Sequence, residues 1–382
     1  MSRDHLYLCG SLYLLPLLWG PLNLVCLVYV TTNCSVRPEK GSCGMLVDPC
    51  WAGLESPFHR SHIVQRMKDL NGTERAVKEF YLVGVPGLQD RQNLLCIVFL
   101  LLYMAVMAGN LLMLYLVLLD QRLHTPMYFF LCHLSVLDVL LSTLILPKMM
   151  AVFLLEDRLI SFAGCFLQMY LILASGSTEY LIMIVMAYDR YVAIMKPLHY
   201  HLIINGKVCV VLTTVAWALG YTAPLLHVLD AMSLPYCGPN IVQYCYCDYS
   251  SVASLACADV TDVLKKANVA AMCVVNIPLA LILGSYFIII LHIYSRSTED
   301  CKKAFSTCAS HLFIVSVSYF STDLLYITAV TGSVSADNRV IMGVLSYLLT
   351  PLLNPIVYSL RNKQIKQASE KYLTFSCGSK TL

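Results

Sequence analysis

Residues 94–119 read LLCIVFLLLYMAVMAGNLLMLYLVLL and contain no charged side chain. A helix needs about 20 apolar residues to cross the hydrocarbon core of a bilayer, which is about 30 Å thick. This stretch is therefore long enough to span a membrane. A helix also satisfies its own backbone polar groups, which find no water inside the bilayer, so a helix is the predicted conformation.

Six further apolar runs of similar length follow this stretch. None alternates between polar and apolar positions, as the strands of a membrane β-barrel do. The sequence thus predicts an all-α membrane protein with a seven-transmembrane helix bundle over residues 94–360. The six further runs cover residues 127–151, 165–188, 208–230, 268–294, 304–330 and 340–360.

The composition agrees with a chain dissolved in lipid. Hydrophobic residues make up 58% of the 382 residues and charged residues 13%, about half the charged share of a typical soluble domain. The mean hydropathy is +0.69, which excludes a disordered chain. A net charge of +3 is too small for a nucleic-acid partner held through phosphates. The seventeen cysteines lie mostly in apolar runs, where a thiol behaves as a small hydrophobe.

Loop charges predict the orientation. Lysine and arginine gather in the loops after the first, third and fifth runs and in the tail 361–382. By the positive-inside rule, that tail is cytoplasmic and the segment 67–93 is extracellular. Asn71 begins an Asn-Gly-Thr glycosylation acceptor on the outer side.

Residues 1–66 form an atypical N-terminal extension. An apolar run from Leu12 to Val30 is interrupted by Pro16 and Pro21. It fits a signal-peptide core, an additional span or a signal anchor. We assign no function to this extension.

Three acids lie inside predicted spans: Asp138 in the second, Glu179 in the third and Asp323 in the sixth. Charges in a membrane are costly and usually functional. The alternative is that each one is protonated or hydrogen-bonded and only links helices.

Sequence motifs accompany these acids at the ends of the spans. Met186-Ala187-Tyr188-Asp189-Arg190-Tyr191 ends the third span and Asn354-Pro355-Ile356-Val357-Tyr358 ends the seventh. Leu123-His124-Thr125-Pro126-Met127-Tyr128 precedes the second, and the string from Lys303 to Leu312 opens the sixth. Together they resemble the olfactory (odorant) receptors of the rhodopsin-like G-protein-coupled class. The resemblance covers about residues 67–372, and Met67 falls where such receptors usually begin.

The resemblance implies a ligand-driven switch in the plasma membrane. A small-molecule odorant would activate a stimulatory heterotrimeric G protein and raise cyclic AMP. Arg190 would be held at rest and freed to meet the G protein when the sixth span swings outward. Pro355 lacks a backbone donor and weakens the helix locally, which favours a hinge. The switch residues would be Asp189, Arg190, Tyr191, Asn354, Pro355 and Tyr358.

Asp138 and Glu179 match positions that line a sodium or water pocket in related receptors, and Asn110 is nearby. Two acids that face one another share a proton or need a cation. We therefore expect a sodium ion near Asp138 and no other cofactor.

The resemblance also implies two disulfides in the outer loops, Cys165–Cys247 and Cys237–Cys257. Such bonds would pin the loop 231–266 to the third span as a lid, which an oxidising compartment permits. Cys245 departs from the family pattern, so the four loop cysteines leave the pairing ambiguous. A metal site in Tyr244-Cys245-Tyr246-Cys247-Asp248 is the less economical alternative.

Ligand-pocket candidates lie in the outer halves of the third and sixth spans. Ile172, Leu173, Gly176 and Ser177 lie roughly 20–27 Å above Arg190 at about 1.5 Å per residue. Tyr319, Asp323 and Tyr326 share one helix face at i, i+4 and i+7, although such a stripe often only packs.

The chemistry of these positions limits the ligand. No acid occupies the outer half of the third span, which disfavours an amine anchored there and favours a small, mostly apolar ligand. Asp323 leaves open a ligand that carries a hydrogen-bond donor or a positive charge. Ser318-Tyr319-Phe320 also departs from the Phe-Tyr-Gly that is frequent in the family.

Other functions stay open at this point. The first alternative is a receptor of the same fold for a non-odorant metabolite outside the olfactory epithelium. A transporter would show repeated halves, and an enzyme would show a phosphate loop, a nucleophile elbow or a water-accessible metal cluster. The sequence contains none of these patterns.

Overall fold

The computed structural model describes residues 77–85, 87, 92–296, 299–331, 334–361 and 363–378. The extension 1–66, with its apolar run from Leu12 to Val30, lies outside these residues. The glycosylation acceptor Asn71 also lies outside them.

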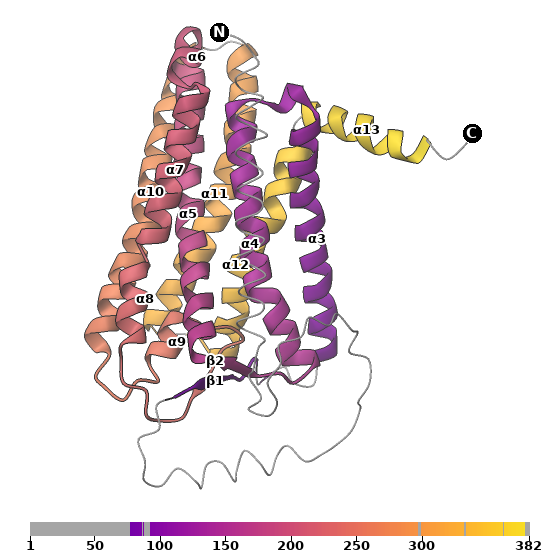
Figure 1. The fold of residues 1–382 in the computed structure, drawn as a ribbon. Helices are drawn as coiled ribbons and strands as arrows, with labels where there is room; N and C mark the ends of the chain where they lie inside the picture. The colour runs from indigo at the N-terminus through magenta and orange to yellow at the C-terminus, as the bar shows by residue number, and fades with distance from the viewer. Residues whose placement is uncertain are drawn as a thin grey trace.

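In the part of the chain that the structure describes, seven long helical segments form a bundle, which Figure 1 shows. Each contains one of the apolar runs, and the fourth is divided between two helices. The segments are α3 (Gln92–Leu119), α4 (Pro126–Leu154), α5 (Phe162–Met195), α7 (Gly206–Thr222) with α8 (Leu225–Met232), α10 (Thr261–Arg296), α11 (Glu299–Thr331) and α12 (Ala336–Arg361). Within the described residues, all of these except α11 are long and apolar enough to cross a membrane. Serine and threonine recur along α11, which packs between α10 and α12.

Proline and polar caps explain several helix ends. Pro224 separates α7 from α8, because proline supplies no backbone N–H to continue the helix. Pro126 starts α4 at a position where a missing N–H costs nothing. The Ser161 hydroxyl accepts a hydrogen bond from the Gly164 N–H at 3.1 Å and caps the start of α5. The α10 helix begins at Thr261, inside the segment expected to be a loop.

Helix α5 is the centre of the bundle and packs against α4, α7, α10 and α11. Its contact with α7 is close enough to require glycine at position 220. A Cβ atom there would lie 2.7 Å from the Cα and 2.8 Å from the N of Thr178 on α5. Glycine therefore lets the two backbones approach one another.

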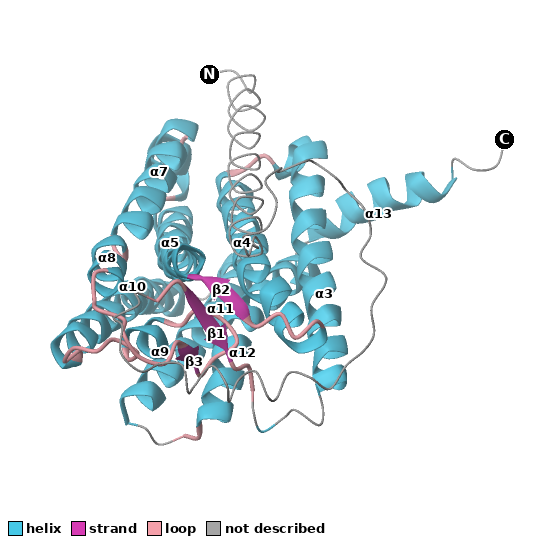
Figure 2. Cartoon of the chain, turned by 60° about the horizontal axis from the view of Figure 1, so that its bottom comes forward, coloured by secondary structure: helices cyan, strands magenta, loops and turns pink. Residues whose placement is uncertain are grey.

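A small sheet covers one end of the bundle, as Figure 2 shows. Strand β1 (Glu79–Leu82) lies between β2 (Leu159–Ser161) and β3 (Ile241–Val242). It is antiparallel to β2 and parallel to β3, with Leu82 opposite Val242. The Phe80 ring is buried and contacts the rings of Phe162, Phe166 and Tyr236. The segment before the first span is thus part of this cap.

The opposite end carries short helices and the C-terminal helix. These are η2 (Gln121–Leu123), η3 (Pro197–His199), α6 (Tyr200–Ile203) and α13 (Lys363–Gly378). Helix α13 runs away from the end of α12 (Figure 1). The cap end also carries α9 (Tyr249–Ala253). Asp189 and Arg190 are thus near the end opposite the sheet.

Candidate functional site

A cavity of about 130 Å³ lies in the cap half of the bundle. Its walls come from α5, α8, α10, α11 and α12, with α9 and the residues before it adding the loop side. Five predicted ligand contacts line it: Ile172, Leu173, Gly176, Ser177 and Tyr326. The third-span candidates are therefore brought together with one residue of the sixth span.

The other two sixth-span candidates, Tyr319 and Asp323, do not line this cavity. Tyr319 is 1% exposed and packs its ring 4.6 Å from that of Tyr180, deeper in the bundle. Asp323 accepts a hydrogen bond at 3.2 Å from the Asn276 amide on α10. The helix face shared by Tyr319, Asp323 and Tyr326 thus lies partly in the contact between helices. Of these three residues, Tyr326 is the one that lines the cavity.

The structure adds polar residues that the sequence did not single out as ligand contacts. They are distributed over the loop and the helices α5, α8, α9, α10 and α12, so only the folded chain brings them together. The sequence offers one indication for Asp248, because this residue directly follows Cys247. It offers no indication that Asp248 lines the cavity. The added residues are Tyr180, His227, Tyr244, Asp248, Tyr249, Asn268, Arg339 and Tyr347.

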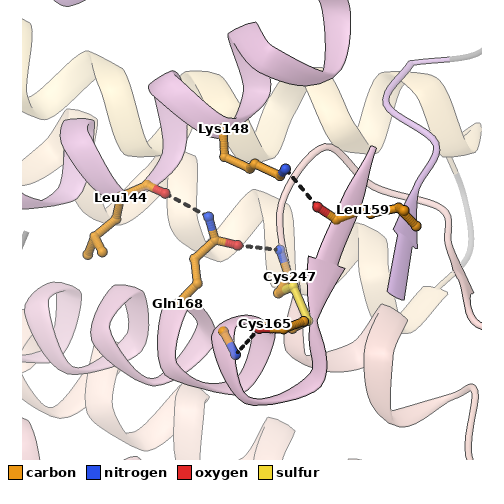
Figure 3. Close-up of a disulfide and its surroundings, with 8 residues drawn as sticks. Leu144, Lys148, Leu159, Cys165, Gln168 and Cys247 are labelled. Atoms are coloured by element: carbon orange, nitrogen blue, oxygen red, sulfur yellow. Dashed lines mark hydrogen bonds between the residues drawn. A yellow bond between two sulfur atoms is a disulfide. The ribbon is translucent and has the colours of Figure 1, made fainter. Parts of the chain in front are cut away.

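A disulfide and a buried glutamine hold the loop over the cavity (Figure 3). Cys165 at the start of α5 is bonded to Cys247. The Gln168 side chain donates to the Leu144 carbonyl at 2.7 Å and accepts from the Cys247 N–H at 3.0 Å. Gln168 therefore joins α4, α5 and the loop at one point.

The second disulfide joins Cys237 to Cys257, so both pairs are those that the resemblance implies. Cys245 is free and buried. Burial raises the pKa of its thiol, which keeps it protonated and unreactive. Among the described residues, no three histidine, cysteine or acidic side chains group as metal ligands would.

Polar groups meet again midway along the bundle. Asp138 accepts a hydrogen bond from the Asn354 amide at 2.9 Å, which links α4 to α12. Asn110 donates to the carbonyls of Val106 and Pro351, each at 3.0 Å. Glu179 on α5 is buried and within electrostatic range of Asp138. Within the described part of the chain, Asp138 Oδ1 and Glu179 Oε1 are buried without a hydrogen-bond partner. Such an oxygen pair fits a small cation or a shared proton.

The predicted switch residues lie toward the far end of the bundle. Arg190 donates through Nε to Asp189 Oδ2 at 2.8 Å and also through its NH2 group. Tyr200 on α6 donates to the other oxygen, Asp189 Oδ1, at 2.6 Å. Asp189 thus holds Arg190 and is itself held by the loop helix α6. Tyr191, the next residue, packs against the buried cluster of this half.

Helix α12 adds the other predicted switch residues. Pro355 packs against Gly109 of α3 so closely that a Cβ on Gly109 would lie 2.8 Å from its Cγ. Tyr358 is buried, and its hydroxyl has no hydrogen-bond partner within the described chain. It lies within electrostatic range of both Asp138 and Arg190. The residues of α12 therefore lie between the midway acids and the arginine.

A family profile described as "Olfactory receptor" matches residues 99–375. The chain belongs to the olfactory receptor family. It is 40% identical over 305 residues to human olfactory receptor 13D1, covering 78% of this chain and 86% of that protein. It is 39% identical over 300 residues to mouse olfactory receptor 5G26, covering 78% of this chain and 94% of that protein. It is also 42% identical over 278 residues to human olfactory receptor 2A12, covering 72% and 89%.

Membership settles the general class of this olfactory receptor. It is a multi-pass membrane protein of a receptor family rather than an enzyme. The family implies an odorant as ligand and a G protein as partner in general terms. The predicted family and fold class are thereby confirmed.

Proposed function

We propose that this receptor binds a small, mostly apolar odorant in the cavity and then activates a stimulatory G protein at the plasma membrane, raising cyclic AMP. The observation that carries the proposal is that one cavity contacts α5, α10, α11 and α12 together. Since α5 also holds Arg190 at its other end, a ligand that changes how these helices pack changes the surroundings of Arg190. A ligand shifts the equilibrium only by its difference in affinity for the two states.

The resting contacts of Arg190 define what must change. Asp189 binds the guanidinium and is held by the Tyr200 hydroxyl. Release of this arrangement would leave Arg190 available to a G protein, with Asn354, Pro355 and Tyr358 of α12 rearranging alongside. Pro355 is the hinge in this scheme because it weakens the helix locally.

We also propose that a sodium ion stabilises the resting state between Asp138 and Glu179. The support is the pair of buried oxygens without partners on these two acids. Asp138→Asn removes one charge and should alter basal or stimulated signalling and its dependence on sodium concentration. Unchanged signalling at every sodium concentration would contradict this part.

The main test measures cyclic AMP in cells that express the chain with the olfactory stimulatory G protein. A panel of chemically diverse volatiles is applied, and surface labelling confirms that the receptor reaches the plasma membrane. A response that disappears in a surface-positive Arg190→Ala variant supports the proposal. Surface-positive wild-type cells that stay silent to the whole panel would count against an odorant ligand or this G protein.

A further inference from the structure

The loop side of the cavity carries a carboxylate with hydrogen bonds to only one of its two oxygens. Asp248 caps α9 through one oxygen, Oδ2, which accepts from Ser250 Oγ at 2.7 Å and from the Ser251 N and Oγ, each at 3.0 Å. Its other oxygen, Oδ1, accepts no hydrogen bond from the described residues. Because Asp248 lines the cavity, this second oxygen is available to a ligand.

Two tyrosines line the same cavity as this carboxylate without a hydrogen bond to it. Tyr326 and Tyr347 both line the cavity and lie within electrostatic range of Asp248. Neither hydroxyl has a hydrogen-bond partner among the described residues. The hydroxyls of Tyr244 and Tyr249, by contrast, donate to the Arg339 and His227 carbonyls at 3.0 and 3.2 Å. Asp248, Tyr326 and Tyr347 therefore each offer an uncommitted oxygen atom to the cavity.

Asp248 forms no ion pair in the described structure. The other fully charged residue in the cavity wall is Arg339, and the ion pairs of the described chain involve neither residue. A ligand that displaces water from a carboxylate incurs a large desolvation cost unless it brings an opposite charge and hydrogen bonds. Tyrosine ring faces also attract cations.

We propose that this receptor's ligand carries a protonated amine and that the Asp248 carboxylate is its anchor. The ammonium donates to Asp248 Oδ1, and the hydroxyl oxygens of Tyr326 and Tyr347 accept its remaining hydrogens. The apolar body lies against Ile172, Leu173 and Val274 of the cavity wall. The inference rests on the proposed function, because it names the chemistry of the ligand for the same cavity.

This anchor reconciles an amine with the acid-free outer half of the third span. The loop supplies the acid in place of that helix. Asp248 follows Cys247, whose position is fixed by its disulfide to Cys165 and its hydrogen bond to Gln168. The carboxylate is thus held in place before the ligand arrives, which reduces the entropy lost on binding.

The test measures thermal stabilisation of the purified full-length receptor, which needs no G protein. The probes are 1-aminohexane, 1-hexanol and hexanoic acid at pH 7, which share an apolar chain and differ in the polar end. We expect the amine to stabilise the receptor at a concentration at least tenfold below that of the alcohol, and the acid to have no effect. This ranking on the wild-type chain tests the proposal without any variant.

Asp248→Asn is the matched variant, because asparagine still caps α9 but has no charge. It should remove the preference for the amine over the alcohol. The control is Asp259→Asn, since Asp259 lies in the same loop, caps through a 3.0 Å bond from the Thr261 N–H, and is exposed outside the cavity wall. This control should keep the preference.

Three results overturn the proposal. They are an amine no better than the alcohol, an unchanged amine preference in folded Asp248→Asn, and stabilisation by the acid that Arg339→Gln abolishes. The last would make the ligand an anion held by Arg339. A receptor that binds the amine but gives no cyclic AMP response instead contradicts the proposed signalling and leaves the ligand chemistry standing.

Discussion

Replacing Gln168 by methionine tests whether the lid over the cavity depends on one buried side chain. Methionine has a similar shape and no polar group that bonds strongly. Gln168 is 1% exposed, and its amide bonds the Leu144 carbonyl and the Cys247 N–H. The substitution removes both bonds and leaves the loop N–H buried without its acceptor.

The expected cost follows from these two bonds. A buried donor left unsatisfied costs about 1–3 kcal/mol, and a lost hydrogen bond to a carbonyl costs about 0.5–1.5 kcal/mol. The free energy of unfolding should therefore fall by about 1.5–4.5 kcal/mol. The Cys165–Cys247 disulfide still limits how far the loop can move, so the variant should fold.

The assay is fluorescence-detected size-exclusion chromatography of the detergent-solubilised receptor after heating. The control is Thr214→Val, because Thr214 is exposed and its hydroxyl bonds only the Val210 carbonyl of its own helix at 2.8 Å. Surface changes of this kind usually stay within about 0.5 kcal/mol. If the melting temperature of Gln168→Met falls no further than that of Thr214→Val, then the lid does not depend on Gln168.

Three other changes have defined outcomes. Gly220→Ala places a Cβ against the backbone of α5. The free energy of unfolding should fall by about 1–3 kcal/mol, measured by the same heating assay. An unchanged melting temperature would contradict the close contact between α5 and α7. Tyr200→Phe removes a 2.6 Å hydrogen bond to the Asp189 carboxylate. Hydrogen bonds to charged groups stabilise by about 1.5–3 kcal/mol. If this bond exists only in the resting state, its loss should raise basal cyclic AMP about tenfold or more. The hydrogen bond from Arg122 lowers the pKa of Asp120, so this pair stabilises the fold above the unfolded pKa of about 3.9, and the stabilisation is lost as pH falls through the lowered pKa. The melting-temperature difference between wild type and Asp120→Asn should therefore be full at neutral pH and vanish in strong acid, and a constant difference would refute the linkage.

The helices were predictable because each long apolar run carries its own signal. The break at Pro224 was not predicted, although proline supplies a local reason for it. The cap sheet had no comparable signal, because its strands are short and β1 pairs with a segment far along the chain. Long helices follow from local sequence, whereas such strand pairs depend on the tertiary fold.

The lining of the cavity was predictable where helix spacing determines direction. Ile172, Leu173, Gly176 and Ser177 line the cavity because a fixed rise along α5 puts them at its depth. Tyr319 and Asp323 do not line the cavity. The Tyr319 ring packs against Tyr180, and the Asp323 carboxylate accepts a hydrogen bond from Asn276 of α10. Spacing defines a helix face, but the neighbouring helices decide which part of that face meets a cavity.

The position of β1 has a consequence for biosynthesis. This strand leaves the ribosome before both of its partners, and roughly 160 residues separate Leu82 from Val242. At about 5–20 residues per second, translation takes roughly 8–30 s to supply the last partner. During that time one edge of β1 has no pairing strand, and unpaired edges invite association with other chains. One edge of this strand therefore stays unpaired until the residues of β3 are made, which precedes synthesis of the fifth span.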